Sequence, residues 1–301
     1  MPKPDRMKNL IWPYALALAA TACQQQAPPA QAVAPVEAHS AAAAPAPARA
    51  PNLPPLFAAA DTLTAPMREL LRQHNLAALW QNDTEERRSQ PAMEGFFGPD
   101  HYRFALVFNE VRRDEQHPEL YHVRGKCRYR RNIRPFSGTL VVRQIKELPD
   151  EHFLESEGLS GEGVPAALTG KTYTARARLQ LLEKQAENSG VFEGEAVLDF
   201  YITPAQKQGY VTSLTGGVDE TTPTRGSGLL VRGKRLNVST KQVKSFVVAG
   251  SAIAAAPDVY KDFAFGDRSE QINPKYAKLG WDELWANDEW WVDAPTPSLN
   301  F

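Results

Sequence analysis

Long stretches of alternating apolar and polar residues constrain the fold of this chain most strongly. Four segments keep a period of two, with apolar side chains on one phase and mostly charged or polar ones on the other: 102–108, 121–130, 173–181 and 192–202. Such alternation is typical of strands that bury one face and expose the other to water. Further strands are expected at 137–147, 208–214, 227–238 and 242–249.

Turn residues, rather than long helical patterns, separate these segments. Glu187-Asn188-Ser189-Gly190 lies between two of them and predicts a hairpin. Helical spacing occurs at 65–80, where Pro66 suits a first turn and the pattern breaks near His74. We therefore expect a mainly β fold: an antiparallel β-sandwich or barrel with short N-terminal helices and a C-terminal aromatic tail.

The first 23 residues have the organisation of a secretory signal. Lys3, Arg6 and Lys8 precede a short apolar run from Leu10 to Ala20. Small residues follow at the expected cleavage site, which completes the pattern of a signal peptide. The run is too short to span a bilayer, which needs about 20 apolar residues.

Cys23 directly follows Ala20-Thr21-Ala22. This arrangement resembles the lipobox of bacterial lipoproteins, although that family prefers Leu where this chain has Ala20. The resemblance implies that Cys23 is acylated and becomes the mature N-terminus. Gln24, rather than Asp, after the cysteine implies release to the outer membrane, so we expect a lipid-anchored protein of the cell envelope that faces the periplasm. The alternative is an ordinary cleaved signal with a cysteine there by chance.

An alanine- and proline-rich stretch follows the cysteine. Residues 27–55 contain 12 Ala and 8 Pro and only two charged residues. Such a tract cannot build a core and is too rich in proline to remain helical, so it is expected to be an extended spacer. The expected organisation is a signal peptide at 1–22, a tether at 23–55 and a β-rich domain at 56–301.

One segment carries a row of basic side chains on a single face. These are His122, Arg124, Lys126, Arg128 and Arg130. Like charges at this spacing repel, so neighbouring elements must supply anions or the row must face water. The row is a candidate contact for an anionic partner, such as phosphate groups of an envelope glycolipid, an acidic polymer or an acidic protein. The simpler interpretation is a solvated or cross-strand-paired face.

Glu193 and Glu195 could be taken for a catalytic carboxylate pair. They share a strand face, and the preceding strand offers Arg176 and Arg178 on the corresponding face. Pairing Leu182 with Val191 would place Arg178 opposite Glu195, and a slip by two residues would place it opposite Glu193. Either register opposes unlike charges, which predicts a structural role for both glutamates.

The C-terminal tail holds four of the six tryptophans of the chain within eleven residues: Trp281, Trp285, Trp290 and Trp291. Acidic residues lie between them. The tail is a candidate aromatic contact for a protein or a sugar, because tryptophan is enriched at binding hot spots. The alternatives are that the tryptophans seal one end of the core, or that the acidic tail docks on the basic row of the same chain.

Catalytic and cofactor motifs are not recognisable in the sequence. Cys127 lies on the apolar phase of its segment and is expected to be buried and inert. No histidine pair or Cys/His cluster has metal-ligand spacing, and neither a Walker A motif nor a GxGxxG or GxSxG motif occurs. We therefore predict no catalytic residues, no metal and no cofactor. A net charge of −1 argues against a nucleic-acid partner.

These observations favour a membrane-anchored envelope lipoprotein whose β domain is a non-catalytic binding or scaffold module. Its expected partners are the membrane, through the lipid anchor, and an envelope protein, a glycan or an anionic lipid. Two alternatives remain: a cell-wall or glycan hydrolase with unassigned acid and base, and a carrier of an apolar ligand inside a barrel.

Overall fold

The computed structural model describes residues 63–82, 91–149, 170–184, 188–213, 218–260, 263–265, 271–283 and 289–292. All of them belong to the compact unit Ala48–Phe301. The predicted signal peptide (1–22), the tether (23–55) and Trp285 lie outside the described residues. Among the described residues, no helix has the length and apolar character needed to cross a membrane.

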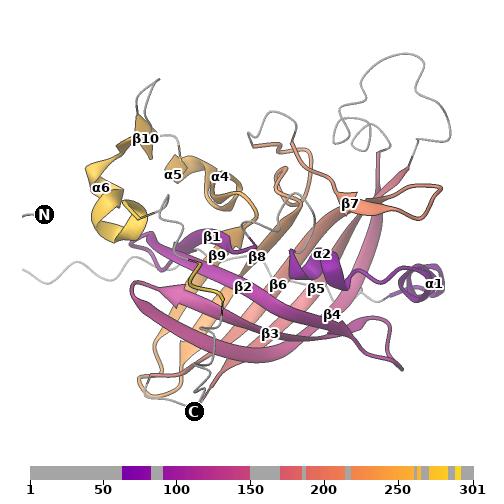
Figure 1. Cartoon of the computed structure of the whole chain (residues 1–301), viewed down its shortest axis with the longest axis horizontal. Coiled ribbons are helices and arrows are strands. Elements are labelled where there is room, and N and C mark those ends of the chain that lie inside the picture. The colour runs from indigo at the N-terminus through magenta and orange to yellow at the C-terminus, as the bar shows by residue number, and fades with distance from the viewer. Residues whose placement is uncertain are drawn as a thin grey trace, which may run out of the picture. The chain divides into compact units, whose positions relative to one another are not determined.

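Strands dominate this part of the chain (Figure 1). The long strands are β2 (Tyr102–Arg113), β3 (Leu120–Tyr129), β4 (Asn132–Leu148), β5 (Lys171–Glu183) and β6 (Gly190–Ile202). The shorter ones are β1 (Met93–Phe97), β7 (Gln208–Tyr210), β8 (Leu229–Asn237), β9 (Val243–Ala249), β10 (Ala264–Phe265) and β11 (Gln271–Ile272). The predicted mainly β fold is confirmed. The five-residue strand β1 was not predicted, because it is too short to show an alternating pattern.

The main sheet closes on itself. Its nine antiparallel strands are hydrogen-bonded in the order β5-β4-β3-β2-β1-β9-β8-β6-β7, and β5 also pairs with β6. This last pairing completes a ring of eight strands, and β7 extends β6 outside the ring. Of the two predicted architectures, the structure therefore has the barrel.

The inward phase of each strand fills the barrel with large side chains. Phe104, Phe192 and Phe246 pack within 6 Å of one another by ring centroid, and all are nearly inaccessible to solvent. The core cluster continues through residues from each of the eight ring strands. The alternation seen in the sequence thus arises because one side of each strand faces this core.

Two short helices, α1 (Ala65–Gln73) and α2 (Ala77–Gln81), close one end of the barrel. The predicted break near His74 is confirmed, because the residue caps the first helix in an extended conformation. Trp80 is fully buried and meets the Tyr121 ring edge-on, and the Tyr210 hydroxyl donates a hydrogen bond to the Leu79 carbonyl. This end of the barrel is therefore filled by apolar side chains.

A second layer covers the outside of β1, β8 and β9. It consists of α4 (Ala252–Ala255), α5 (Pro257–Tyr260), α6 (Pro274–Tyr276) and a π-helical turn at Ala277–Trp281 (Figure 1). Trp281 is fully buried in this layer, against Phe96 and Phe263. The outer face of the barrel is thus only partly exposed to water, contrary to a simple picture of one wet and one dry face per strand.

Candidate functional site

The first four residues of the basic row lie on the outer face of β3, Arg130 follows at the β3–β4 turn, and neighbouring groups contact most members of the row. The His122 imidazole lies 3.1 Å from the Asp114 carboxylate, and Arg124 forms an exposed ion pair of 3.5 Å with Glu110. The hydrogen bond from His122, together with backbone N–H donors, lowers the pKa of Asp114 below its usual range. This half of the row is paired across to β2 and the loop that follows it.

The other half of the row meets the C-terminal tail. Lys126 donates a 3.0 Å hydrogen bond to the Trp291 carbonyl, and Arg128 lies 3.3 Å from the Glu283 carboxylate. Arg103 of β2 also donates to the Glu283 carbonyl, at 2.7 Å. The tail thus docks on the same molecule, and the structure places the Glu283 carboxylate against Arg128 of the row.

The described tryptophans of the tail, Trp281, Trp290 and Trp291, pack against other residues of the same chain. Trp281 belongs to the outer layer, and its indole N–H donates to the His101 carbonyl at 3.1 Å. Trp290 packs on Ala105 and Val107 of β2 and is only 7% exposed. Trp291, which meets Trp290 edge-on, is half-buried.

Between the tail and the end of β3, a basic cleft remains open. Its volume is about 380 Å³, and it is lined by the outer face of β2 and β3 on one side and by residues 277–283 on the other. We define the basic cleft by its cationic side chains: Arg103, Arg128, Arg130, Arg131 and Lys278. Two members of the predicted row, Arg128 and Arg130, therefore line it, whereas His122, Arg124 and Lys126 do not.

The cations of the basic cleft differ in how they are held. Arg103 is bound by both oxygens of Glu94, at 2.7 and 2.9 Å. Arg130 has a left-handed backbone conformation at the β3–β4 turn and lies 4.5 Å from the centroid of the Tyr102 ring. Arg130 and Arg131 are exposed, so the cleft presents positive charge to solvent at its open side.

The two carboxylates of the basic cleft are Asp282 and Glu283. They are adjacent in the chain and both exposed. Glycosidases instead hold two carboxyl groups on opposite sides of the bond that they cleave. The five cationic side chains outnumber these two carboxylates, so the lining of the cleft is predominantly basic.

Glu193 and Glu195 lie on the outer face of β6 in the first of the two predicted registers. Leu182 pairs with Val191 and Arg178 with Glu195. The closest partners of Glu195 are nevertheless Arg176 and Arg232, the latter at 3.0 Å. The Glu195 side chain is fully buried. Arg176 pairs with Val197 in the strand register, so its contact with Glu195 runs diagonally across two positions. A long side chain spans this offset easily.

Cys127 faces the core, as its phase predicted, and is 3% exposed. Burial, with a further contribution from the negative charge of Glu183, raises the pKa of its thiol well above the usual range. A thiol held in its neutral form is a poor nucleophile. Cys127 is therefore an inert core residue.

A polar pocket at the open end of the barrel was not identified from the sequence. It has a volume of about 270 Å³ and lies at the opposite end from α1 and α2. Its charged side chains are Arg134, Glu183, Arg235 and Lys244. In each strand, the charged residue lies two positions from an inward-facing apolar residue and therefore also faces inward. A charged residue at the end of a series of alternating apolar residues was thus the sequence signal that could have revealed this pocket.

Comparisons with known proteins give no further assignment. The scan against protein-family models found no match, and the searches of the curated proteins and of the solved structures found none at the significance required.

Proposed function

We propose that this chain is a lipid-anchored protein of a bacterial cell envelope, whose β domain binds phosphate groups of an anionic lipid without catalysing a reaction. The basic cleft carries the proposal. It is an open hollow of about 380 Å³ with the exposed guanidinium groups of Arg130 and Arg131 at its rim. Arginine binds phosphate oxygens in a bidentate manner, which adds geometric specificity to charge attraction.

The N-terminal sequence supports a membrane location for this activity. Acylation at Cys23 would hold the chain at a membrane, and the tether at 23–55 would let the domain reach the bilayer surface. A tethered domain meets lipid headgroups at high effective concentration, so a modest intrinsic affinity is sufficient.

The filled interior of the barrel favours surface binding over transport of an apolar ligand. Phe104, Phe192 and Leu198 are at most 1% exposed and belong to one continuous core. A carrier instead needs an enclosed apolar cavity of several hundred Å³.

The anchor is tested in a Gram-negative bacterial host. Wild-type chain is expected in the membrane fraction with an acylated N-terminus at Cys23, whereas Cys23→Ala is expected in the soluble fraction without lipid. Retention of the Cys23→Ala chain in the membrane fraction would contradict the proposed anchor.

The cleft is tested with the unacylated Cys23→Ala chain and vesicles. We expect binding to vesicles that contain phosphatidylglycerol and little binding to pure phosphatidylcholine vesicles. Replacing Arg130 and Arg131 together by Gln should weaken binding by roughly thirtyfold, because each basic residue near an anionic surface contributes about 1 kcal/mol.

The matched control removes two positive charges elsewhere. Lys207 and Lys234 are exposed and lie outside the basic cleft, so Lys207→Gln with Lys234→Gln should leave vesicle binding nearly unchanged. Equal weakening by both double variants would show that net charge, rather than the cleft, determines binding.

A further inference from the structure

Four aliphatic side chains lie side by side across four strands at the open end of the barrel. Leu182 of β5 pairs with Val191 of β6, Val191 with Leu236 of β8, and Leu236 with Val243 of β9. We call these four residues the aliphatic row. Leu182, Leu236 and Val243 are 51, 37 and 54% exposed, and Val191 is half-buried. Neighbouring strands are about 4.8 Å apart, so the row is about 14 Å long.

The aliphatic row belongs to the outer face of the barrel. Leu181 and Phe192 are the chain neighbours of two of its members and are fully buried in the core. Because side chains alternate along a strand, the row faces away from that core. Val238, two residues after Leu236, extends the row toward the β8–β9 turn and is 44% exposed. Single exposed aliphatic residues are common, whereas a contiguous patch marks a surface that binds a partner or a membrane.

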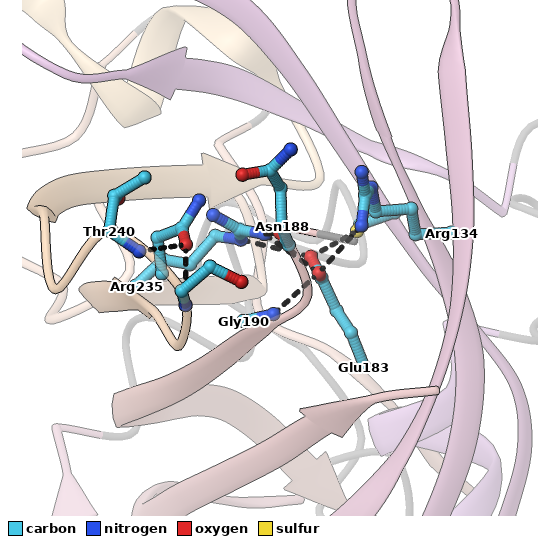
Figure 2. A network of polar contacts seen from close by, with 9 residues as sticks. Arg134, Glu183, Asn188, Gly190, Arg235 and Thr240 are labelled. Atoms are coloured by element: carbon cyan, nitrogen blue, oxygen red, sulfur yellow. Dashed lines mark hydrogen bonds and ion pairs between the residues drawn. The ribbon is translucent and has the colours of Figure 1, made fainter. Parts of the chain in front are cut away.

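The two hairpins that carry the aliphatic row are joined to each other on their inner side. Arg235 of β8 donates to both oxygens of the buried Glu183 of β5, at 2.9 and 2.7 Å, and to the Asn188 carbonyl at 2.8 Å (Figure 2). The Val238 N–H also donates to the Ser189 carbonyl, at 2.9 Å. These bonds hold the β5–β6 and β8–β9 hairpin ends together, so the row is preorganised for binding.

The turns at the open end of the barrel contain more basic than acidic residues. The basic ones are all exposed: Arg130, Arg131, Lys184 and Lys241. The acidic ones are Asp100, which is exposed, and Glu187, which lies outside the described residues. This surplus of positive charge beside the aliphatic row favours a partner that is both apolar and anionic. Two copies of this face would repel each other, so the charge argues against self-association.

From this arrangement we infer that the open end of the barrel docks on an anionic bilayer, with the aliphatic row at the boundary between headgroups and acyl chains. Lysine stems lie along apolar surface while the ammonium groups reach outward, so Lys184 and Lys241 can meet lipid phosphates. Farther along the strands the outer face is polar: Glu193 pairs with Gln180 on one side and with Lys234 on the other. This polar layer limits insertion to the row.

The inference rests on the proposed function, because it takes the same anionic membrane as the partner, and it adds the element that enters the bilayer. The basic cleft reaches the open end at the β3–β4 turn, on the side of the barrel away from the aliphatic row. One orientation of the domain therefore brings both surfaces to the membrane.

Insertion is measured with a fluorescent label at the aliphatic row. In the Cys23→Ala chain, Val243→Cys supplies an exposed thiol, whereas Cys127 is buried. A nitrobenzoxadiazole label there should be quenched by doxyl-labelled lipid in vesicles that contain phosphatidylglycerol. The control is Ala205→Cys, because Ala205 is exposed at the β6–β7 turn, at the opposite end of the barrel, and its label should not be quenched. Equal quenching at both positions would overturn the inference.

Serine substitutions test whether the aliphatic row contributes to affinity. Val243→Ser should weaken binding to vesicles that contain phosphatidylglycerol about threefold or more, and adding Leu182→Ser should bring the loss to about tenfold or more, because less apolar surface leaves water. Val292→Ser is the matched control: Val292 is 56% exposed, much like Val243, but lies outside the row. Equal affinities of Val243→Ser and Val292→Ser would contradict the inference. Circular dichroism checks that each variant is folded.

The same measurements separate this inference from the proposed cleft. Undiminished vesicle binding and quenching at Val243 after Arg130→Gln with Arg131→Gln would contradict the cleft and leave the inference standing. Vesicle binding that depends on Arg130 and Arg131 without quenching at Val243 would support the cleft and overturn the inference. Analytical ultracentrifugation covers the remaining occupant: a dimer that forms without vesicles and is lost in Val243→Ser would assign the aliphatic row to a second copy of the chain and overturn the inference.

Discussion

Some residues on the outer face of the barrel are more deeply buried than the alternating sequence pattern suggests. Glu195 lies on the nominally solvent-facing phase of β6, yet Arg176 and Arg232 cover it completely. The sequence predicted unlike charges on neighbouring strands and therefore a structural role for this glutamate. The participation of Arg232 was not predictable, because β8 follows β6 by some thirty residues and its position beside β6 is a tertiary feature.

Glu195→Gln should lower the free energy of unfolding by about 2 kcal/mol, because it removes the buried negative charge that the guanidinium groups of Arg176 and Arg232 both contact. Urea denaturation measures the change. Glu193→Gln, two residues away and exposed, is the control and should change stability by less than about 0.5 kcal/mol. Equal effects of the two substitutions would show that Glu195 has no special role.

Cys127 should resist alkylation in the native protein. Its raised pKa keeps the thiol neutral at about pH 8.5, where an ordinary cysteine is about half ionised. In the Cys23→Ala chain, Cys127 is the remaining thiol, so iodoacetamide incorporation reports on it alone. We expect slow labelling at about pH 8.5 without denaturant. Labelling should be complete in about 6 M guanidinium, which unfolds most proteins. Fast native labelling would contradict the burial.

Among the elements, the C-terminal tail changes most between sequence and structure. The sequence showed an acidic, tryptophan-rich segment and a basic row, with docking of one on the other as an alternative. The structure brings Glu283 to Arg128 and the Trp291 carbonyl to Lys126. The tail thus occupies part of the row and leaves the basic cleft open at the β3–β4 turn.

Trp290→Ala should detach the end of this tail from β2. Trp290 covers Ala105 and Val107, so the substitution removes apolar burial and should cost about 2 kcal/mol of unfolding free energy. Equilibrium denaturation is the measurement. Val292→Ala is the control, because Val292 is 56% exposed and should contribute little. A Trp290→Ala chain as stable as the control would show that the docked segment does not stabilise the barrel.

The whole barrel depends on close approach of strands at inward-facing glycines. A side chain at Gly138 of β4 would place its Cβ atom 2.0 Å from the Gln180 carbonyl oxygen of β5. Comparable close contacts occur at other glycines of the barrel: Gly95, Gly125, Gly194 and Gly233. Glycines of this kind let strands curve enough for a sheet to close.

Gly138→Ala should therefore be strongly destabilising, by roughly 3 kcal/mol or more, because backbone rather than a flexible side chain must move. Ser137→Ala, at the adjacent exposed position of the same strand, should be close to neutral. Thermal unfolding followed by circular dichroism compares the two. Similar melting temperatures would show that the β4–β5 pair accommodates a Cβ atom there.

Local alternation was sufficient to predict the long strands, the phase of Cys127 and the break between the two N-terminal helices. These features depend on residues within a few positions of one another, so a linear pattern contains them. Closure of the barrel, the partners of the basic row and the charged pocket around Glu183 depend instead on pairings between distant strands, such as β1 with β9 and β6 with β8. The alternating pattern of the sequence predicts on which face of its strand each side chain lies. The order of the strands in the closed sheet determines which of these side chains meet across the barrel.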